Sequence, residues 1–252
     1  MVATSKSLLS FTDIQSTRAL IKSKDGFIID CDGVIYHGDK LLPGALEFTT
    51  HLRESGKRYL FLTNSSDKST QQLVEKFARL GIKTEAEHFY TSSMATATFL
   101  SKQKPSGRVF VIGQSSLKET LVAQGMLVVG EEKAEMSCPD FSVVGECPEL
   151  YTFANLEFAI KLVRRGARLI GTNEDVADRL GDELQPGVGA LILPIAATSG
   201  YQPYFVGKPN PLMVRSALDR LGIRRDKAVV IGDRMNTDIK AGVEADVDTV
   251  SS

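Results

Sequence analysis

Residues 26–38, GFIIDCDGVIYHG, decide the fold class, because a short apolar run ends here in two acids and a glycine. Short apolar runs bounded by turn residues are typical of strands that are covered on both faces of a parallel sheet. A second such run, 59–63, ends in TNSS, and the residues between the two runs place apolar side chains at helical spacing. Strand and helix thus alternate, which predicts an α/β fold with a doubly wound, Rossmann-like parallel sheet.

The middle of the chain repeats this alternation, with strands expected at 108–113, 141–145 and 167–173. The pattern of the first unit resumes at 203–211, PYFVGKPNP, and AVVIGD at 228–233 reads as a last buried strand. We therefore predict a core domain formed by 1–83 plus 203–252, with a second α/β domain inserted at 84–202.

Charge and composition exclude several classes of function. The 252 residues include 30 Lys and Arg against 31 Asp and Glu, a net charge of -1 that gives no electrostatic footprint for nucleic acid. No run approaches the roughly 20 apolar residues of a membrane span. The three cysteines form no CxxC pair, which favours a reducing compartment. We expect a cytoplasmic protein with no nucleic-acid or membrane partner.

Four polar clusters follow predicted strands: Asp30 with Asp32, Thr63 with Asn64, Lys208, and Asp233 with Asp238. The carboxyl ends of parallel strands meet at one edge of a sheet, so these clusters are expected to converge. Carboxylate oxygens of Asp30 and Asp233 suit Mg²⁺, and Lys208 adds a fixed positive charge for phosphoryl oxygens. The Thr63 hydroxyl and backbone N–H groups near Asp32 and Asn64 can complete a phosphate cradle. Together the clusters predict a site for phosphoryl transfer.

The segments that carry these residues resemble known motifs. FIIDCDGVIYHG resembles the first motif of the haloacid dehalogenase superfamily, and TNSS, VGKPNP and IGDRMNTDI resemble its second, third and fourth motifs in the same order. PGALEF and GTNEDV add a similarity to its NagD-like branch, which includes p-nitrophenyl, nucleotide and phosphoglycolate phosphatases. The resemblance covers about residues 25–250.

The resemblance implies a role for each matching residue. Asp30 would be the nucleophile that forms an aspartyl-phosphate, and Asp32 would act as general acid and then general base. Thr63, Asn64 and Lys208 would bind the phosphoryl group. Mg²⁺ would be held by Asp30, the backbone carbonyl of Asp32, and Asp233. Asp238 would lie behind them and orient Lys208 or a metal-bound water.

The inserted domain resembles the type II cap of the superfamily. Asn173 and Asp175, in its TNED segment, are candidates for substrate contact, although a strand-end turn explains them equally well. The resemblance implies a small phosphorylated metabolite as substrate: a nucleoside monophosphate, a sugar phosphate or the reporter p-nitrophenyl phosphate. A homodimer formed through the cap is a further expectation.

Two features depart from the family pattern. Asn236 occupies a position where many relatives carry an acid, and this substitution could weaken metal binding. The sequence stops at DTVSS, whereas relatives usually continue with a further strand and helix, so an exposed sheet edge is expected. Three alternatives stay open: a receiver-type signalling module, a phosphate-binding regulatory relative with little turnover, and a sugar phosphotransferase. The second acid of the DxD pair and the large insertion favour the phosphatase.

Overall fold

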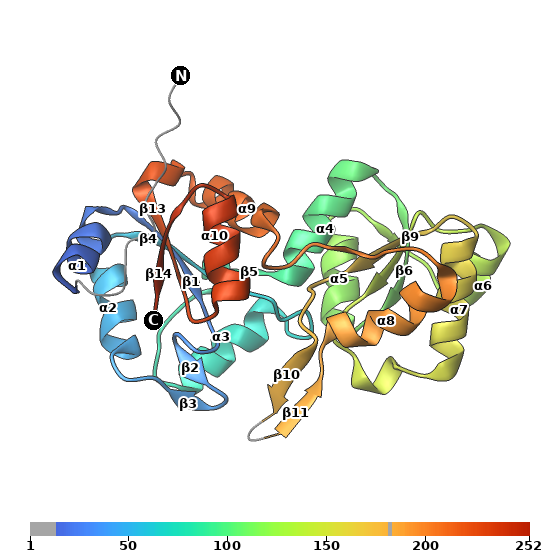
Figure 1. The fold of residues 1–252 in the computed structure, drawn as a ribbon, viewed down its shortest axis with the longest axis horizontal. Coiled ribbons are helices and arrows are strands. Elements are labelled where there is room, and N and C mark those ends of the chain that lie inside the picture. Colours follow the sequence, from blue (N-terminus) through green and yellow to red (C-terminus); the bar gives the residue numbers. More distant parts are fainter. Residues whose placement is uncertain (1–13, 181–182) are drawn as a thin grey trace.

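Two five-stranded parallel sheets, each covered by helices, make up the two lobes of the molecule (Figure 1). The computed structural model describes residues 14–180 and 183–252. Residues 1–13 of the predicted core domain therefore lie outside the described residues. The doubly wound α/β class predicted from the sequence is confirmed in both lobes.

The first lobe has the strand order β14-β13-β1-β4-β5. Its strands are β1 (Gly26–Asp30), β4 (Arg58–Thr63), β5 (Phe89–Thr91), β13 (Ala228–Gly232) and β14 (Asp248–Ser251). Successive side chains of a strand point to opposite faces, so Phe27 and Ile29 pack on one side and Ile28 on the other.

Helices cover both faces of this sheet. They are α1 (Ile14–Ser23), α2 (Ala45–Glu54), α3 (Thr70–Arg79), α9 (Pro211–Leu221) and α10 (Lys240–Glu244). Leu52 of α2 and Phe77 of α3 pack with Phe27, whereas Met213 of α9 packs with Ile28. Short 3-10 turns, η1 (Ala86–His88) and η3 (Arg225–Lys227), precede β5 and β13, and a π-helical turn, η4 (Met235–Ile239), precedes α10.

The second lobe has the order β12-β9-β8-β6-β7. Its strands are β6 (Arg108–Ile112), β7 (Leu127–Val128), β8 (Phe141–Val144), β9 (Arg168–Gly171) and β12 (Tyr204–Phe205). Its helical elements are α4 (Ser92–Gln103), α5 (Ser115–Ala123), α6 (Glu131–Met136), η2 (Pro148–Leu150), α7 (Phe153–Arg164) and α8 (Val188–Ser199).

Two antiparallel hairpins accompany the sheets. One joins β2 (Tyr36–His37) to β3 (Lys40–Leu41), and the other joins β10 (Ala177–Leu180) to β11 (Glu183–Pro186). Figure 1 shows β10 and β11 projecting from the second lobe toward the first.

Sheet membership corrects the predicted domain boundaries at 84 and 202. β5 lies beyond the first boundary, yet Phe89 pairs with Phe61 of β4 in the first sheet. β12 lies beyond the second boundary, yet Tyr204 pairs with Ile170 of β9 in the second sheet. Both strands have only two or three residues, too few to show in a local apolar pattern which sheet they join.

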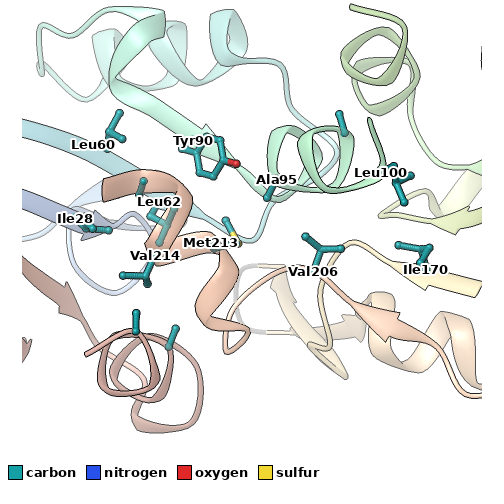
Figure 2. Packing of buried hydrophobic residues seen from close by; sticks show 14 of the residues in the cluster. Ile28, Leu60, Leu62, Tyr90, Ala95, Leu100, Ile170, Val206, Met213 and Val214 are labelled. Atoms are coloured by element: carbon teal, nitrogen blue, oxygen red, sulfur yellow. The ribbon is translucent and has the colours of Figure 1, made fainter. Parts of the chain in front are cut away.

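One apolar cluster runs through both lobes (Figure 2). It connects Ile28 and Leu62 of the first sheet to Ile170 of the second through Met213 of α9 and Val206 after β12. The two lobes therefore share a continuous interior. Across the described ranges, no helix combines the length and apolar character that crossing a membrane requires.

Candidate active site

A cavity of about 550 Å³ opens where the carboxyl ends of the first sheet meet the second lobe. Asp30 and Thr63 are the last residues of β1 and β4, Asp233 follows β13, and Lys208 follows β12. All of the predicted core residues line it: Asp30, Asp32, Thr63, Asn64, Lys208, Asp233 and Asp238. The structure thus brings the four sequence clusters together, as strand-end geometry predicts.

Lys208 lies at the centre of the buried charges. Its Nζ is 2.5 Å from Asp30 Oδ1 and 2.5 Å from Asp238 Oδ1, and it donates to the Leu62 carbonyl at 3.2 Å. Burial alone would lower the pKa of the ammonium, but the Asp238 and Asp30 carboxylates raise it above its ordinary value. Lys208 therefore carries a permanent positive charge beside Asp30.

Asp30 is a buried carboxyl group at the end of a fully buried strand. Burial and, to a smaller extent, the Asp238 charge raise its pKa to about 7 against the lowering effect of Lys208. A second positive charge, in addition to that of Lys208, would favour the ionised form of this carboxyl near neutral pH.

Two glycines allow the acids to approach one another. Gly33 has φ +83°, and a Cβ there would lie 2.2 Å from Asp233 Oδ2. A Cβ on Gly232 would lie 2.1 Å from the Cβ of Asp238. Side chains at these positions would push both acids away, so the glycines are needed for the close approach.

Asp30, Asp233 and Asp238 offer carboxylate oxygens that all lie within 4.8 Å of one another. Burial and the neighbouring Asp238 charge raise the pKa of Asp233 by more than the Lys208 and Arg234 charges lower it. Asp238 is already engaged, because its Oδ2 accepts from Arg234 N and Thr237 Oγ1, both at 3.3 Å. Asp30 and Asp233 are therefore the acids with oxygens free for a hard cation such as Mg²⁺.

Asp32 differs from Asp30 because its side chain is 63% exposed and reaches into the cavity. The imidazole Nδ1 of His37 lies 3.3 Å from Asp32 Oδ1. The spacing of the histidines in the sequence does not predict this contact, because the contact depends on where the short β2–β3 hairpin places His37 at the cavity wall. The Asp32 carboxyl is placed to exchange protons with a molecule in the cavity.

Asn64 connects three segments of the chain. Its Oδ1 accepts from Lys208 N at 2.8 Å, and its Nδ2 donates to the Lys208 carbonyl at 3.0 Å and to Asp175 Oδ2 at 2.7 Å. The Asn64 side chain thus fixes the backbone of Lys208, while the phosphate contact expected of the backbone N–H near Asn64 stays a prediction. Thr63, by contrast, is buried at the cavity wall, where its Oγ1 accepts from Ser65 N at 3.1 Å.

The two candidate substrate contacts, Asn173 and Asp175, lie in different positions relative to the cavity. Asp175 lines the cavity, and its Oδ1 is 3.0 Å from Nη1 of Arg234, an ion pair without an aligned hydrogen bond. Asn173 is buried outside the described cavity wall and donates to the Asn64 carbonyl at 2.9 Å. Both residues tie the second lobe to the first. Of the two explanations that the sequence left open for Asn173, these bonds favour the structural one, since its Oδ1 also accepts from Asp175 N at 3.0 Å.

Further cavity residues were not predicted from the sequence: Asp67, Lys68, Lys76, Glu146, Asp178, Gln185 and Arg234. They come from loops, from one face of α3 and from the β10–β11 hairpin, where no strand-end rule applies. Asn236, the departure from the family pattern, has an exposed side chain in η4 and is not among the described residues of the cavity wall.

Comparison with known proteins agrees with this geometry. Two family models match, haloacid dehalogenase-like hydrolase over residues 27–127 and HAD-hydrolase-like over residues 205–251. Acid sugar phosphatase of Staphylococcus saprophyticus is 34% identical over 230 residues, 91% of this chain and 86% of that protein. The chain belongs to the haloacid dehalogenase-like hydrolases. Dihydroxyacetone phosphatase of Corynebacterium glutamicum is 36% identical over 224 residues, 89% of this chain and 79% of that protein.

A solved haloacid dehalogenase-like structure, NagD from E. coli K-12, matches with a TM-score of 0.83 at 34% identity. The match covers 91% of this chain and 87% of that one. The NagD-like branch predicted from the sequence motifs is confirmed. This haloacid dehalogenase-like hydrolase is an enzyme that acts on phosphate monoesters, which favours the phosphatase over the receiver-type module.

Proposed function

We propose that this hydrolase releases phosphate from small phosphorylated metabolites with Mg²⁺, by way of an aspartyl-phosphate on Asp30. The observation that supports it most is the contact of Lys208 with both Asp30 and Asp238, next to Asp233, at one end of a parallel sheet. This arrangement neutralises a nucleophilic carboxylate so that it can approach an anionic phosphoryl group.

The donor set fits Mg²⁺. Asp30 and Asp233 provide hard oxygens, and Gly33 leaves the Asp32–Gly33 backbone open to Asp233, which allows the Asp32 carbonyl to complete the set. When bound, the cation supplies positive charge that offsets the charge of Asp30 and of the phosphoryl oxygens. Asp238 then acts through Lys208, which it holds in place.

The residues of the chain account for both chemical steps. An Asp30 oxygen attacks phosphorus, and the bond from phosphorus to the leaving-group oxygen breaks while Asp32 protonates that oxygen. Lys208 and Thr63 bind the transferring phosphoryl oxygens. Asp32, now a carboxylate, takes a proton from water, whose oxygen attacks phosphorus and breaks the bond to Asp30. Phosphate leaves, and both carboxyl groups return to their starting states.

Cavity size and the relatives' names together suggest the substrate class. About 550 Å³ holds a small metabolite, and walls from the second lobe limit water at the reacting atoms. The two relatives are named for sugar phosphates and dihydroxyacetone phosphate. Sugar and triose phosphates are therefore the first candidates, followed by nucleoside monophosphates, with p-nitrophenyl phosphate as a reporter.

A phosphate-release screen tests the proposal. With Mg²⁺ we expect turnover of several small esters, loss of activity in EDTA, and a fall of at least about 1,000-fold for Asp30→Asn, since the amide is not a nucleophile. Asp39→Asn, an exposed acid in the turn between β2 and β3, is the matched control and is expected to match the parent. Equal activity in Asp30→Asn and the parent would contradict the mechanism. One stoichiometric phosphorylation without turnover would support the receiver-type module instead.

A further inference from the structure

The loop that follows Thr63 is bonded to the second lobe rather than to its own sheet. Ser66, in the middle of this loop, is fully buried. Its Oγ accepts from Glu146 N at 2.9 Å and from Thr172 Oγ1 at 3.1 Å. Its carbonyl accepts from Ser93 Oγ at 3.0 Å and from Ser116 Oγ at 3.3 Å. The second lobe therefore anchors the loop, whose Ser65 N donates to the Thr63 hydroxyl at 3.1 Å.

Glu146, in the loop after β8, closes this contact with its carboxyl group. Its Oε2 accepts from Ser66 N and its Oε1 from Asn173 Nδ2, each at 3.3 Å. The same carboxyl is hydrogen-bonded to the carboxyl of Asp67 in the loop. Two carboxyl groups share a hydrogen bond only when one of them carries a proton.

The surroundings decide which of the two is protonated. Asp67 accepts from Ser65 Oγ at 2.5 Å and from Lys68 Nζ at 2.7 Å. Burial by itself would raise the pKa of Asp67, but Lys68 and these hydrogen bonds lower it, so Asp67 is the carboxylate. Burial first, and then the Asp67 charge, raise the pKa of Glu146 well above its ordinary value. The proton belongs to Glu146.

We propose that Glu146 is a positioning residue that holds the loop after Thr63 against the second lobe while its carboxyl is protonated, and that releases it on ionisation. Three other charged groups face Glu146: Asp67 and Lys68 from the loop, and Asp178 from β10. Lys68 is already paired with Asp67. Cys147 beside it stays neutral, because burial raises the pKa of its thiol to about 12. An ionised Glu146 would thus face the carboxylates of Asp67 and Asp178, and the nearby cation, Lys68, is already paired with Asp67.

This inference rests on the proposed function only for its catalytic readout. A group whose pKa is higher in the folded protein stabilises it at low pH, and that stabilisation is lost as pH rises through the raised pKa. The loop contact is therefore expected to weaken with increasing pH. Phosphoryl binding by Thr63 should weaken with it, so kcat/KM should fall about tenfold per pH unit above the pKa of Glu146.

Two substitutions and one control test this. Glu146→Gln cannot ionise, yet it keeps an oxygen for Ser66 N and a donor for Asp67. We expect kcat/KM within about threefold of the parent at low pH, without the alkaline decline assigned to Glu146. Glu146→Ala loses both contacts and should fall at least about fivefold at every pH. Glu149→Gln removes an exposed acid three residues away that accepts from Gln114 Nε2 at 2.7 Å, and it should follow the parent's profile.

Thermal unfolding provides a readout that needs no turnover. Glu146→Gln should match the parent near pH 5 and unfold at a higher temperature than the parent near pH 9. Identical pH profiles and identical melting shifts for the parent and Glu146→Gln would overturn the inference, even if Glu146→Ala fails to fold. If the parent hydrolyses no ester, the proposed function fails, while the melting comparison still decides the role of the Glu146 proton.

Discussion

Asp178 faces the active-site cavity from β10, and within the described residues no hydrogen bond or salt bridge engages its carboxyl. Burial, followed by the neighbouring Asp175 charge, raises its pKa to about 6. A raised pKa means that folding favours the protonated form, so stability is lost as pH rises from the ordinary value of 3.8 through about 6.

Asp178→Asn should therefore stabilise the protein at pH 7.5 by about 1 kcal/mol, a value reduced for partial solvent screening, with no gain near pH 4. Unfolding measured at the two pH values checks this. Glu183→Gln on the partner strand β11, where the side chain is exposed, is the control and should show no pH-dependent gain. An equal shift for Asp178→Asn at both pH values would show that ionisation is not the cause.

The sequence revealed those site residues whose position follows from a strand end. Asp30, Thr63 and Asp233 were predictable because parallel strands deliver their last residues to one edge. Glu146 and Asp178 were not, because each reaches the cavity only when the second lobe is placed over the first. The side chains of Asn64 and Asn173 join segments of the chain, a use that their strand-end positions alone do not reveal.

Among the helices, α3 has the best-defined start. Ser69 Oγ accepts from Gln72 N at 3.2 Å, and the Gln72 side chain accepts from Ser69 N at 2.8 Å, which forms a capping box. The cap satisfies two N–H groups that the helix itself leaves without partners. It also fixes where the loop after Thr63 ends.

Ser69→Ala should lower the free energy of unfolding by about 1 kcal/mol, because one of these N–H groups loses its acceptor. Urea unfolding measures the change. Ser101→Ala in α4, where the hydroxyl donates to the Thr98 carbonyl of the same helix, should cost less than about 0.5 kcal/mol. Equal losses for the two variants would mean that the capping box does not stabilise α3.

At the level of elements, long buried strands were predictable and short ones were not. The runs that form β1, β6, β8 and β13 consist mostly of apolar residues, so their own sequence indicates a buried strand. The segment 203–211 was predicted to return to the first sheet, but its only strand residues, 204–205, add to the edge of the second. A two-residue strand forms because it pairs with a neighbouring strand, and its own sequence is too short to predict that pairing.

The shared apolar interior sets how the whole molecule responds to a local change. Chains of this size with two lobes often unfold in steps. Here Val206, which is fully buried, packs in the cluster that connects Ile28 of β1 to Val143 of β8 (Figure 2). Such a connection favours unfolding of both lobes in one transition.

Val206→Ala should therefore destabilise the two lobes together, by about 2 kcal/mol, because it leaves a cavity between them. Hydrogen exchange of the β1 and β8 amides measures the stability of the first and the second lobe separately. We expect the same loss of amide protection in both sheets. Leu193→Ala, an exposed position on α8, should change neither. If protection fell in β8 and stayed unchanged in β1, the lobes would be energetically independent. The contacts of Ser66 and Glu146 would then have to position the loop after Thr63 without support from a common core.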